Sequence, residues 1–202
     1  MKAKVTAVKQ QVKRADRYSI YVDGKYTFSL HERQLVASGL HSGQELTKSE
    51  LAAFQSESTE GKLFDRLLNV LSYRPRSEWE LRDYLRRKQA EPEIADKLIE
   101  KLRELRYVDD EAFARAWVES RMASKPTSRR KLKAELQAKR VDAAIIDNVL
   151  EEAADSASDS IAIQQLIEKK RARYPDETKL MQYLARQGFS YGDIRSALER
   201  HD

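Results

Sequence analysis

Residues 77–85 read SEWELRDYL, and the same arrangement recurs as SRRKLKAEL at 128–136 and as DETKLMQYL at 176–184. Each copy opens on a residue that caps helices well, and its leucines stand four positions apart, on one helix face. A proline one or two residues upstream ends the preceding helix. About 50 residues separate successive copies, a period that is typical of stacked repeat arrays.

Each copy is flanked by two further helical patterns. A short break and a possible capping residue follow it, and the next segment carries apolar pairs four residues apart. The segment before each proline carries an apolar face of its own. The pairs are Ala95 with Ile99, Ile146 with Leu150 and Ile194 with Leu198; the faces are Phe64, Leu67, Leu68 and Leu71, then Phe113, Ala116 and Trp117, then Ile163, Leu166 and Ile167. The repeating unit is therefore predicted to contain three helices.

The N-terminal segment has a different period. Tyr18, Ile20 and Val22 alternate with polar residues and lead to Asp23-Gly24, a dipeptide typical of two-residue hairpin turns. A short helix is predicted over 32–38 and should end at Gly39. Thr47 with Glu50 forms a capping box that opens the next helix.

The fold class that follows is mainly α. We expect an elongated tandem array of three three-helix repeats, preceded by a small N-terminal segment that contains a β-hairpin. The predicted segments are 1–58 for the N-terminal part, 59–108 for the first repeat, 109–155 for the second and 156–202 for the third.

Composition narrows the class of protein. The chain has 202 residues, a formal net charge of +5 and 35% charged residues, and a basic excess suits an anionic partner. It contains no cysteine, which excludes disulfides, thiolate catalysis and cysteine-based zinc sites. No apolar run approaches the roughly 20 residues of a membrane span. We therefore expect a cytoplasmic protein with no membrane partner.

The residues give no sign of a catalytic site or a cofactor, and we expect a protein that binds without being an enzyme. Three scattered histidines and six glycines provide no phosphate loop and no histidine cluster. The run Asp109-Asp110-Glu111 is the densest acidic cluster and suits a metal-dependent nuclease in principle. A helix N-cap at Asp109 is the stronger interpretation, because acidic residues in a first turn complement the helix dipole.

Basic residues fall at related positions of successive copies. Spacing also favours ion pairs within helices, such as Glu78 with Arg82 and Asp83 with Arg87. If related positions line one surface of a stacked array, they form a basic stripe that suits phosphate backbones or an acidic groove. The predicted site residues are Arg74, Arg76, Arg82, Arg86, Arg87, Lys88, Arg129, Arg130, Lys131, Lys133, Lys139, Arg140, Lys170, Arg171 and Arg173, with no catalytic and no metal-binding residue among them.

Three segments resemble the RecX family, which regulates the RecA recombinase. Residues 76–85 resemble its first repeat, residues 188–194 its third, and residues 105–121 carry the most specific match, LRYVDDEAFARAWVESR. The sequence departs from the family pattern at Arg106, where glycine is usual, and at Gln89-Ala90 and Lys139-Arg140, where Lys-Gly is commoner. These departures leave the geometry of the local turns open.

The resemblance implies a function. Family members lie in the groove of the RecA nucleoprotein filament across neighbouring protomers, and they reduce ATP hydrolysis, strand exchange and filament growth in DNA repair, recombination and the SOS response. By the same resemblance, Trp79, Tyr84, Tyr107, Phe113 and Trp117 are expected to be packing residues. We expect a monomer whose partners are the RecA filament and DNA, single-stranded and also double-stranded. The alternative is a stand-alone DNA-binding protein of helix-turn-helix type.

Overall fold

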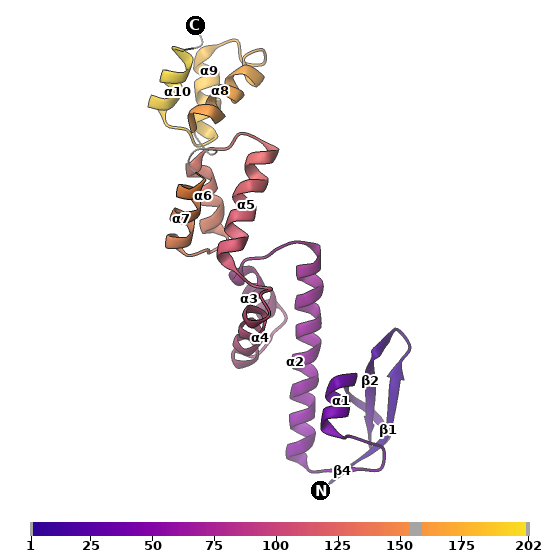
Figure 1. Ribbon diagram of the computed structural model, residues 1–202. Coiled ribbons are helices and arrows are strands. Elements are labelled where there is room, and N and C mark those ends of the chain that lie inside the picture. The colour runs from indigo at the N-terminus through magenta and orange to yellow at the C-terminus, as the bar shows by residue number, and fades with distance from the viewer. Residues whose placement is uncertain (1, 154–158, 201–202) are drawn as a thin grey trace. The chain divides into compact units, whose positions relative to one another are not determined.

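The computed structural model describes residues 2–153 and 159–200, and Figure 1 shows its elements in chain order. The chain divides into two compact units, one formed by Met1–Arg74 with Lys88–Leu98 and the other by Pro75–Arg87 with Ile99–Asp202. The first predicted repeat is thus shared between the units. The predicted boundaries after residues 58 and 108 stay predictions, and the one after residue 155 lies outside the described residues.

The first unit contains an antiparallel sheet. Its strands are β1 (Ala3–Gln11), β2 (Arg14–Val22), β3 (Lys25–His31) and β4 (Glu45–Leu46), in the spatial order β3-β2-β1-β4. The sequence patterns do not predict β4, because two residues are too few to show an alternation. Val5, Ile20 and Phe28 are among the side chains that form the core of this sheet.

The predicted turns of this unit are confirmed. Asp23 and Gly24 both have positive φ, 47° and 79°, as a type I′ hairpin turn requires. Helix α1 (Glu32–Ser38) ends at Gly39, which takes the left-handed conformation with φ of 62°. Thr47 and Glu50 exchange side-chain and backbone hydrogen bonds at the start of α2 (Lys48–Tyr73), the capping box that the sequence indicates.

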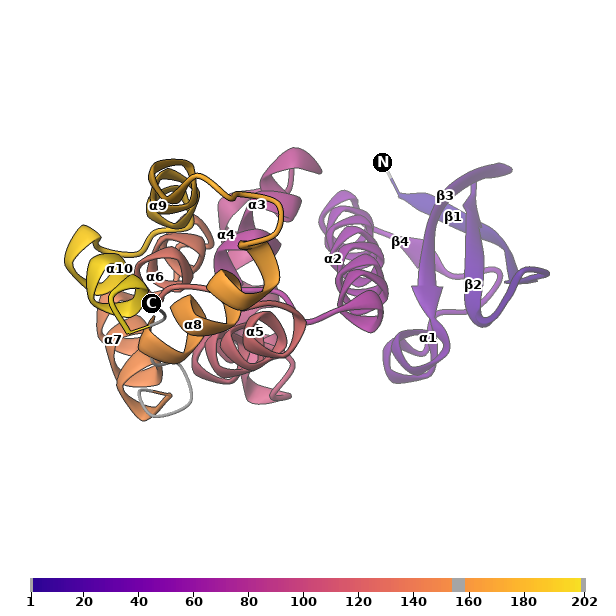
Figure 2. The ribbon, with the colours of Figure 1, turned by 90° about the horizontal axis from the view of Figure 1, so that it is seen from above.

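Helix α2 lies alongside the sheet, as Figures 1 and 2 show. Phe54 stacks on Phe28 of β3, with ring centroids 5.7 Å apart. Nearer the end of α2, Asp65 accepts a hydrogen bond of 2.5 Å from the Arg17 guanidinium, which is only 2% exposed. Arg17 also donates to the hydroxyl and carbonyl oxygens of Ser29. A buried ion pair therefore fixes this part of α2 against the strands.

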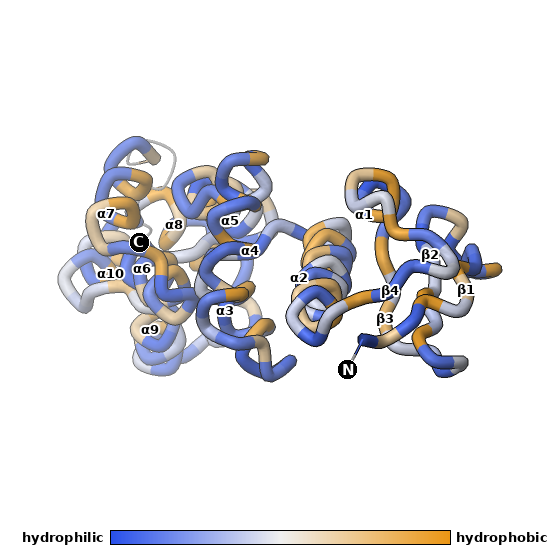
Figure 3. Tube along the Cα trace, turned by 90° about the horizontal axis from the view of Figure 1, so that it is seen from below, coloured by the Kyte–Doolittle hydropathy of each residue, from blue (hydrophilic) through white to orange (hydrophobic). Residues whose placement is uncertain are grey.

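Eight further helices follow α1 and α2 in the described residues. They are α3 (Glu78–Arg87), α4 (Pro92–Glu104), α5 (Asp110–Ser124), α6 (Arg129–Ala138), α7 (Ala143–Glu152), α8 (Asp159–Lys170), α9 (Glu177–Arg186) and α10 (Tyr191–Leu198). The prediction of a mainly helical chain with three-helix repeats and a small N-terminal strand segment is confirmed. Figure 3 shows that these helices carry both hydrophilic and hydrophobic residues, as amphipathic helices do.

The second and third repeats each have a core of their own. Leu132 and Leu136 of the second copy are fully buried. Leu180 and Leu184 of the third copy are at most 2% exposed. One predicted face is wrong in part: Ala116 of α5 is exposed. The buried stripe of α5 contains Phe113, Ala114 and Val118, with Trp117 packed against it, so Ala116 falls on the opposite side of the helix.

A residue in the left-handed conformation lies two positions after the end of the second helix of each repeat. These residues are Gln89 (φ 56°), Arg140 (57°) and Gly188 (99°), and Arg106 takes the same region (56°) after α4. Arg140 and Arg106 therefore keep the left-handed turn although glycine is usual at their positions. In the first repeat the left-handed residue is Gln89, and not Ala90, where glycine is commoner. Side chains with a Cβ atom pay about 1–2 kcal/mol for this conformation.

Candidate interaction surface

One set of hydrogen bonds joins the first repeat to the second, within the second compact unit. Ser77 caps α3, because its Oγ accepts the N–H of Glu80, and the same hydroxyl donates to the carbonyl of Lys139 at 2.9 Å. The N–H of Glu78 donates to Asp110 Oδ1 at 2.8 Å. The N-terminal end of one repeat's second helix is thus hydrogen-bonded to two residues of the next repeat.

The same bonds recur between the second and third repeats. Ser128 accepts the N–H of Lys131 and donates to the carbonyl of Gln187 at 2.9 Å, and the N–H of Arg129 donates to Asp159 Oδ1 at 2.8 Å. Both serine side chains are fully buried. Because bonds of the same length and type join both pairs, the repeats follow one another in the same register.

The third residue of each capped helix adds a contact of a different kind at each junction. At the first junction Glu80 pairs with the Lys139 ammonium at 2.7 Å. At the second, the Lys131 ammonium donates to the side-chain amide oxygen of Gln187 at 2.9 Å. The third copy begins with Asp176, whose carboxylate accepts the N–H of Lys179. An ionised carboxylate cannot donate as the two serines do.

Gly188 is required by the second junction. A Cβ atom at this position would lie 2.4 Å from Ser128 Oγ, well inside the contact distance of the two atoms. Its φ of 99° also lies where side chains are strained. The Ser128 hydroxyl therefore fits at this junction only because residue 188 has no side chain.

The acidic residues at both junctions are partly buried. Burial raises the pKa of the Asp110 carboxyl above its ordinary value, against the effect of the Glu78 N–H that it accepts. Burial likewise raises the pKa of Asp159, and the Asp193 carboxylate adds to the effect, while the N–H of Arg129 opposes it. Each carboxylate is thus held at the junction at some electrostatic cost.

The acidic run at the start of α5 has a structural role. Asp109 caps the helix by accepting the N–H groups of Glu111 and Ala112, as the N-cap interpretation predicts. The Asp110 carboxylate accepts the Glu78 N–H and so helps to join the first repeat to the second. Within residues 2–153 and 159–200, no cluster of three or more potential metal ligands is present. No helix in these ranges has the length and apolar character to cross a membrane.

Ion pairs with carboxylates neutralise several of the predicted site residues. Arg82 pairs with Glu78 at 2.8 Å, and Arg86 and Arg87 both pair with Asp83. Further pairs are Lys133 with Asp147 and Lys139 with Glu80. The predicted pairs of Glu78 with Arg82 and of Asp83 with Arg87 are therefore confirmed. Charge at these positions is largely neutralised within the protein.

The other predicted cations have different surroundings. Lys131 contacts an amide, Arg129 lies beside Asp159, and Lys170 and Arg173 lie over the rings of Tyr183 and Tyr174. Arg74, Lys88 and Arg171 also have partners in the structure. In the described part of the chain, Arg76, Arg130 and Arg140 have no carboxylate partner, and the buried Nε of Arg76 has no acceptor. Their assignment to a binding stripe stays a prediction.

Two aromatic residues that were expected to be packing residues are exposed. Trp79 is 42% and Tyr107 54% exposed, because Trp79 lies on the side of α3 away from Leu81 and Tyr107 lies in the turn after α4. Phe113 is buried, as predicted. Trp117 is half-buried, with its indole N–H donating to Glu135 and the Arg121 guanidinium over its ring.

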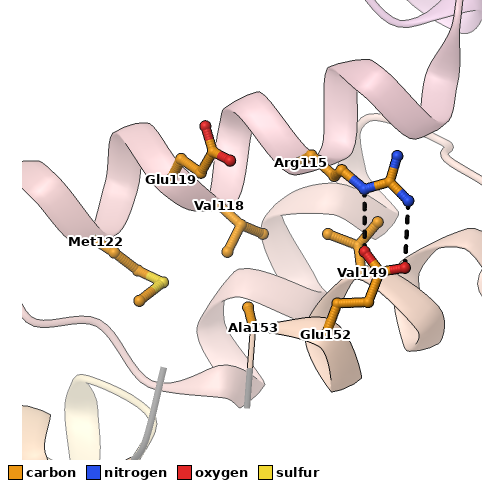
Figure 4. A pocket seen from close by; sticks show the side chains of 7 residues that line it. All are labelled: Arg115, Val118, Glu119, Met122, Val149, Glu152 and Ala153. Carbon is orange, nitrogen blue, oxygen red and sulfur yellow. Dashed lines mark hydrogen bonds and ion pairs between the residues drawn. The ribbon is translucent and has the colours of Figure 1, made fainter. Parts of the chain in front are cut away.

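A hollow of about 350 Å³ lies between α5 and α7 (Figure 4). Val118, Met122 and Val149 give it an apolar floor, and Arg115 and Glu152 form a two-point ion pair across one end, at 3.0 and 3.2 Å. Glu111 binds the same arginine. Because these carboxylates already neutralise Arg115, the hollow offers no free positive charge to an anionic partner.

The fold and these junctions define a tandem three-helix repeat protein whose repeats are locked by serine caps. Four family models match the chain: the regulatory protein RecX N-terminal domain at residues 3–47, and the first, second and third three-helix domains of RecX at 64–102, 109–150 and 162–198. The chain belongs to the RecX family of regulatory proteins.

Relatives and solved structures agree with this assignment. The chain is 31% identical over 192 residues to regulatory protein RecX of Listeria monocytogenes, covering 93% of this chain and 71% of that protein. It is 30% identical over 205 residues to regulatory protein RecX of Bacillus subtilis, covering 97% and 76%. A crystal structure of regulatory protein RecX aligns over 98% of this chain and 99% of its own, with a TM-score of 0.77 and 28% identity. A second, of RecX from Lactobacillus salivarius, covers 70% of this chain and 95% of its own, with a TM-score of 0.62 and 27% identity.

Proposed function

We propose that this protein binds the RecA nucleoprotein filament in its groove, as a monomer and across neighbouring RecA protomers. There it reduces ATP hydrolysis, strand exchange and filament growth. Membership of the RecX family and the names of its relatives as regulatory proteins support this proposal.

The observation that carries the proposal is the repeated junction. The hydrogen bonds of Ser77 recur at Ser128, so successive repeats are joined in the same way. Their corresponding helices can therefore contact a partner at regular intervals. A filament presents identical protomers in a regular series as well. A protein with matched repeats can contact several protomers at once, and linked contacts raise the overall affinity strongly without any new type of contact.

The test is the effect of the purified chain on RecA. We expect an amount of protein well below that of RecA to depress ATP hydrolysis that depends on single-stranded DNA, and to slow strand exchange. Unchanged rates at equimolar protein would contradict the proposal. Tight, sequence-dependent binding to duplex DNA, with no effect on RecA, would favour the helix-turn-helix alternative.

A pair of matched variants tests the basic stripe. Arg140 and Arg173 are exposed and have no carboxylate partner in the described residues, whereas Arg86 and Arg87 share Asp83. Replacing the first two by glutamine is expected to weaken inhibition of RecA several-fold. Replacing the second two removes the same formal charge and is expected to change inhibition much less. Equal effects of the two double variants would show that the stripe has no specific role.

A further inference from the structure

A second hollow, of about 450 Å³, lies where the second and third repeats meet. Its lining comes from three helices: Arg130 of α6, Gln182, Ala185 and Arg186 of α9, and Tyr191 of α10. Only Arg130 belongs to the basic residues that the sequence singles out. The hollow is open to solvent, and no acidic side chain lines it.

Two guanidinium groups in this hollow are available to a ligand. Among the described residues, neither Arg130 nor Arg186 has a carboxylate partner. The Nε of Arg186 donates to the carbonyl of Gln182 on its own helix at 3.2 Å, which directs the group while its terminal nitrogens stay available. Guanidinium groups bind phosphate oxygens with two parallel hydrogen bonds.

An exposed aromatic ring completes the lining. Tyr191 is the first residue of α10 and is 64% exposed. A single exposed aromatic side chain is ordinary on a protein surface. An exposed ring beside two uncompensated arginines is the combination that proteins use for single-stranded nucleic acids, in which bases stack on the ring and cations follow the backbone.

The first junction shows that packing between repeats does not require the side chains of Arg186 and Tyr191. The same serine and backbone hydrogen bonds hold both junctions together. In the register of the copies, the residues that correspond to Arg130, Gln182, Arg186 and Tyr191 are Trp79, Ala134, Ala138 and Ala143. Alanine at the positions of Gln182, Arg186 and Tyr191 supports the same junction, so Arg186 and Tyr191 are free to serve a ligand.

We propose that this hollow binds a segment of single-stranded nucleic acid, with Arg130 and Arg186 on backbone phosphates and Tyr191 stacked on a base. The inference rests on the proposed function, because the single strand inside a filament is what the site would meet. A duplex suits the site poorly, since its bases are already stacked on each other. An acidic protein segment would use the arginines and leave the ring without a role.

The test measures binding of a fluorescently labelled oligothymidylate to the full chain without RecA, by anisotropy at several salt concentrations. Tyr191→Leu is expected to weaken binding about 5-fold or more, whereas Tyr191→Phe, which keeps the ring, stays within about 2-fold of the unmodified protein. Arg130→Gln and Arg186→Gln are each expected to lower the slope of log K against log salt by about 0.7. Tyr107→Leu and Arg195→Gln, which remove an exposed ring and a cation outside the hollow, serve as controls.

The outcomes separate this inference from the proposed function. Inhibition of RecA by the unmodified chain, with oligothymidylate binding that Tyr191→Leu leaves unchanged, would overturn the inference and leave the proposed function standing. Tyrosine-dependent binding with no effect on RecA would support the inference and remove the proposed function. Equal affinity for duplex, or equally effective competition by polyglutamate, would overturn the inference.

Discussion

Replacing Ser128 by alanine removes one hydroxyl that makes two hydrogen bonds. The first is the cap of α6, whose loss costs about 1 kcal/mol. The second joins the repeats, and its loss leaves the partly buried carbonyl of Gln187 without this donor, at about 1–2 kcal/mol. The free energy of unfolding should therefore fall by about 2–3 kcal/mol, which corresponds to about 4–12 °C in Tm for a chain of this size.

Asp176→Ala is the matched control, because Asp176 caps α9 without a bond to another repeat. It should cost about 1 kcal/mol, the value of a cap alone. Ser77→Ala should resemble Ser128→Ala, since its hydroxyl makes the corresponding bonds. Thermal and denaturant unfolding of the three variants measure the difference. Equal losses for Ser128→Ala and Asp176→Ala would show that the serine hydroxyls do not hold the repeats together.

Three further predictions concern stability. Asp65→Ala should cost about 3–5 kcal/mol in denaturant unfolding, because it leaves the Arg17 cation buried without its carboxylate, and a near-neutral result would contradict this. Gln89→Gly should stabilise the chain by up to about 1 kcal/mol, since glycine relieves the left-handed backbone, and a loss in Tm would count against it. Asp159 has a raised pKa in the folded state, so the folded chain binds its proton more tightly and stability from this group falls as pH rises above the ordinary value. The stability of Asp159→Asn relative to the unmodified chain should therefore rise between pH 3 and pH 7. The relative stability of Glu152→Gln should fall over the same range, because the Arg115 guanidinium lowers the pKa of Glu152. The same trend in both variants would contradict this prediction.

The helices, the hairpin strands and the repetition of the helices can be predicted from the residues alone. A proline, a capping residue and two leucines four apart are local signals, and each acts within one or two helical turns. The hairpin turn at Asp23-Gly24, the stop at Gly39 and the cap at Asp109 are local in the same sense. These features are therefore found where the patterns predict them.

Which side chains remain available to a partner depends on the three-dimensional arrangement of the helices. Spacing within a helix predicts the pairing of Arg87 with Asp83, but Lys139 finds Glu80 across a junction, 59 residues away in the chain. The sequence pattern likewise predicts Arg130 as a binding residue but does not predict Arg186 or Tyr191. The turn of the third repeat brings these two residues beside Arg130. Caps and turns depend on neighbours along the chain, whereas neutralised and available charges depend on neighbours in space, which a single sequence does not specify.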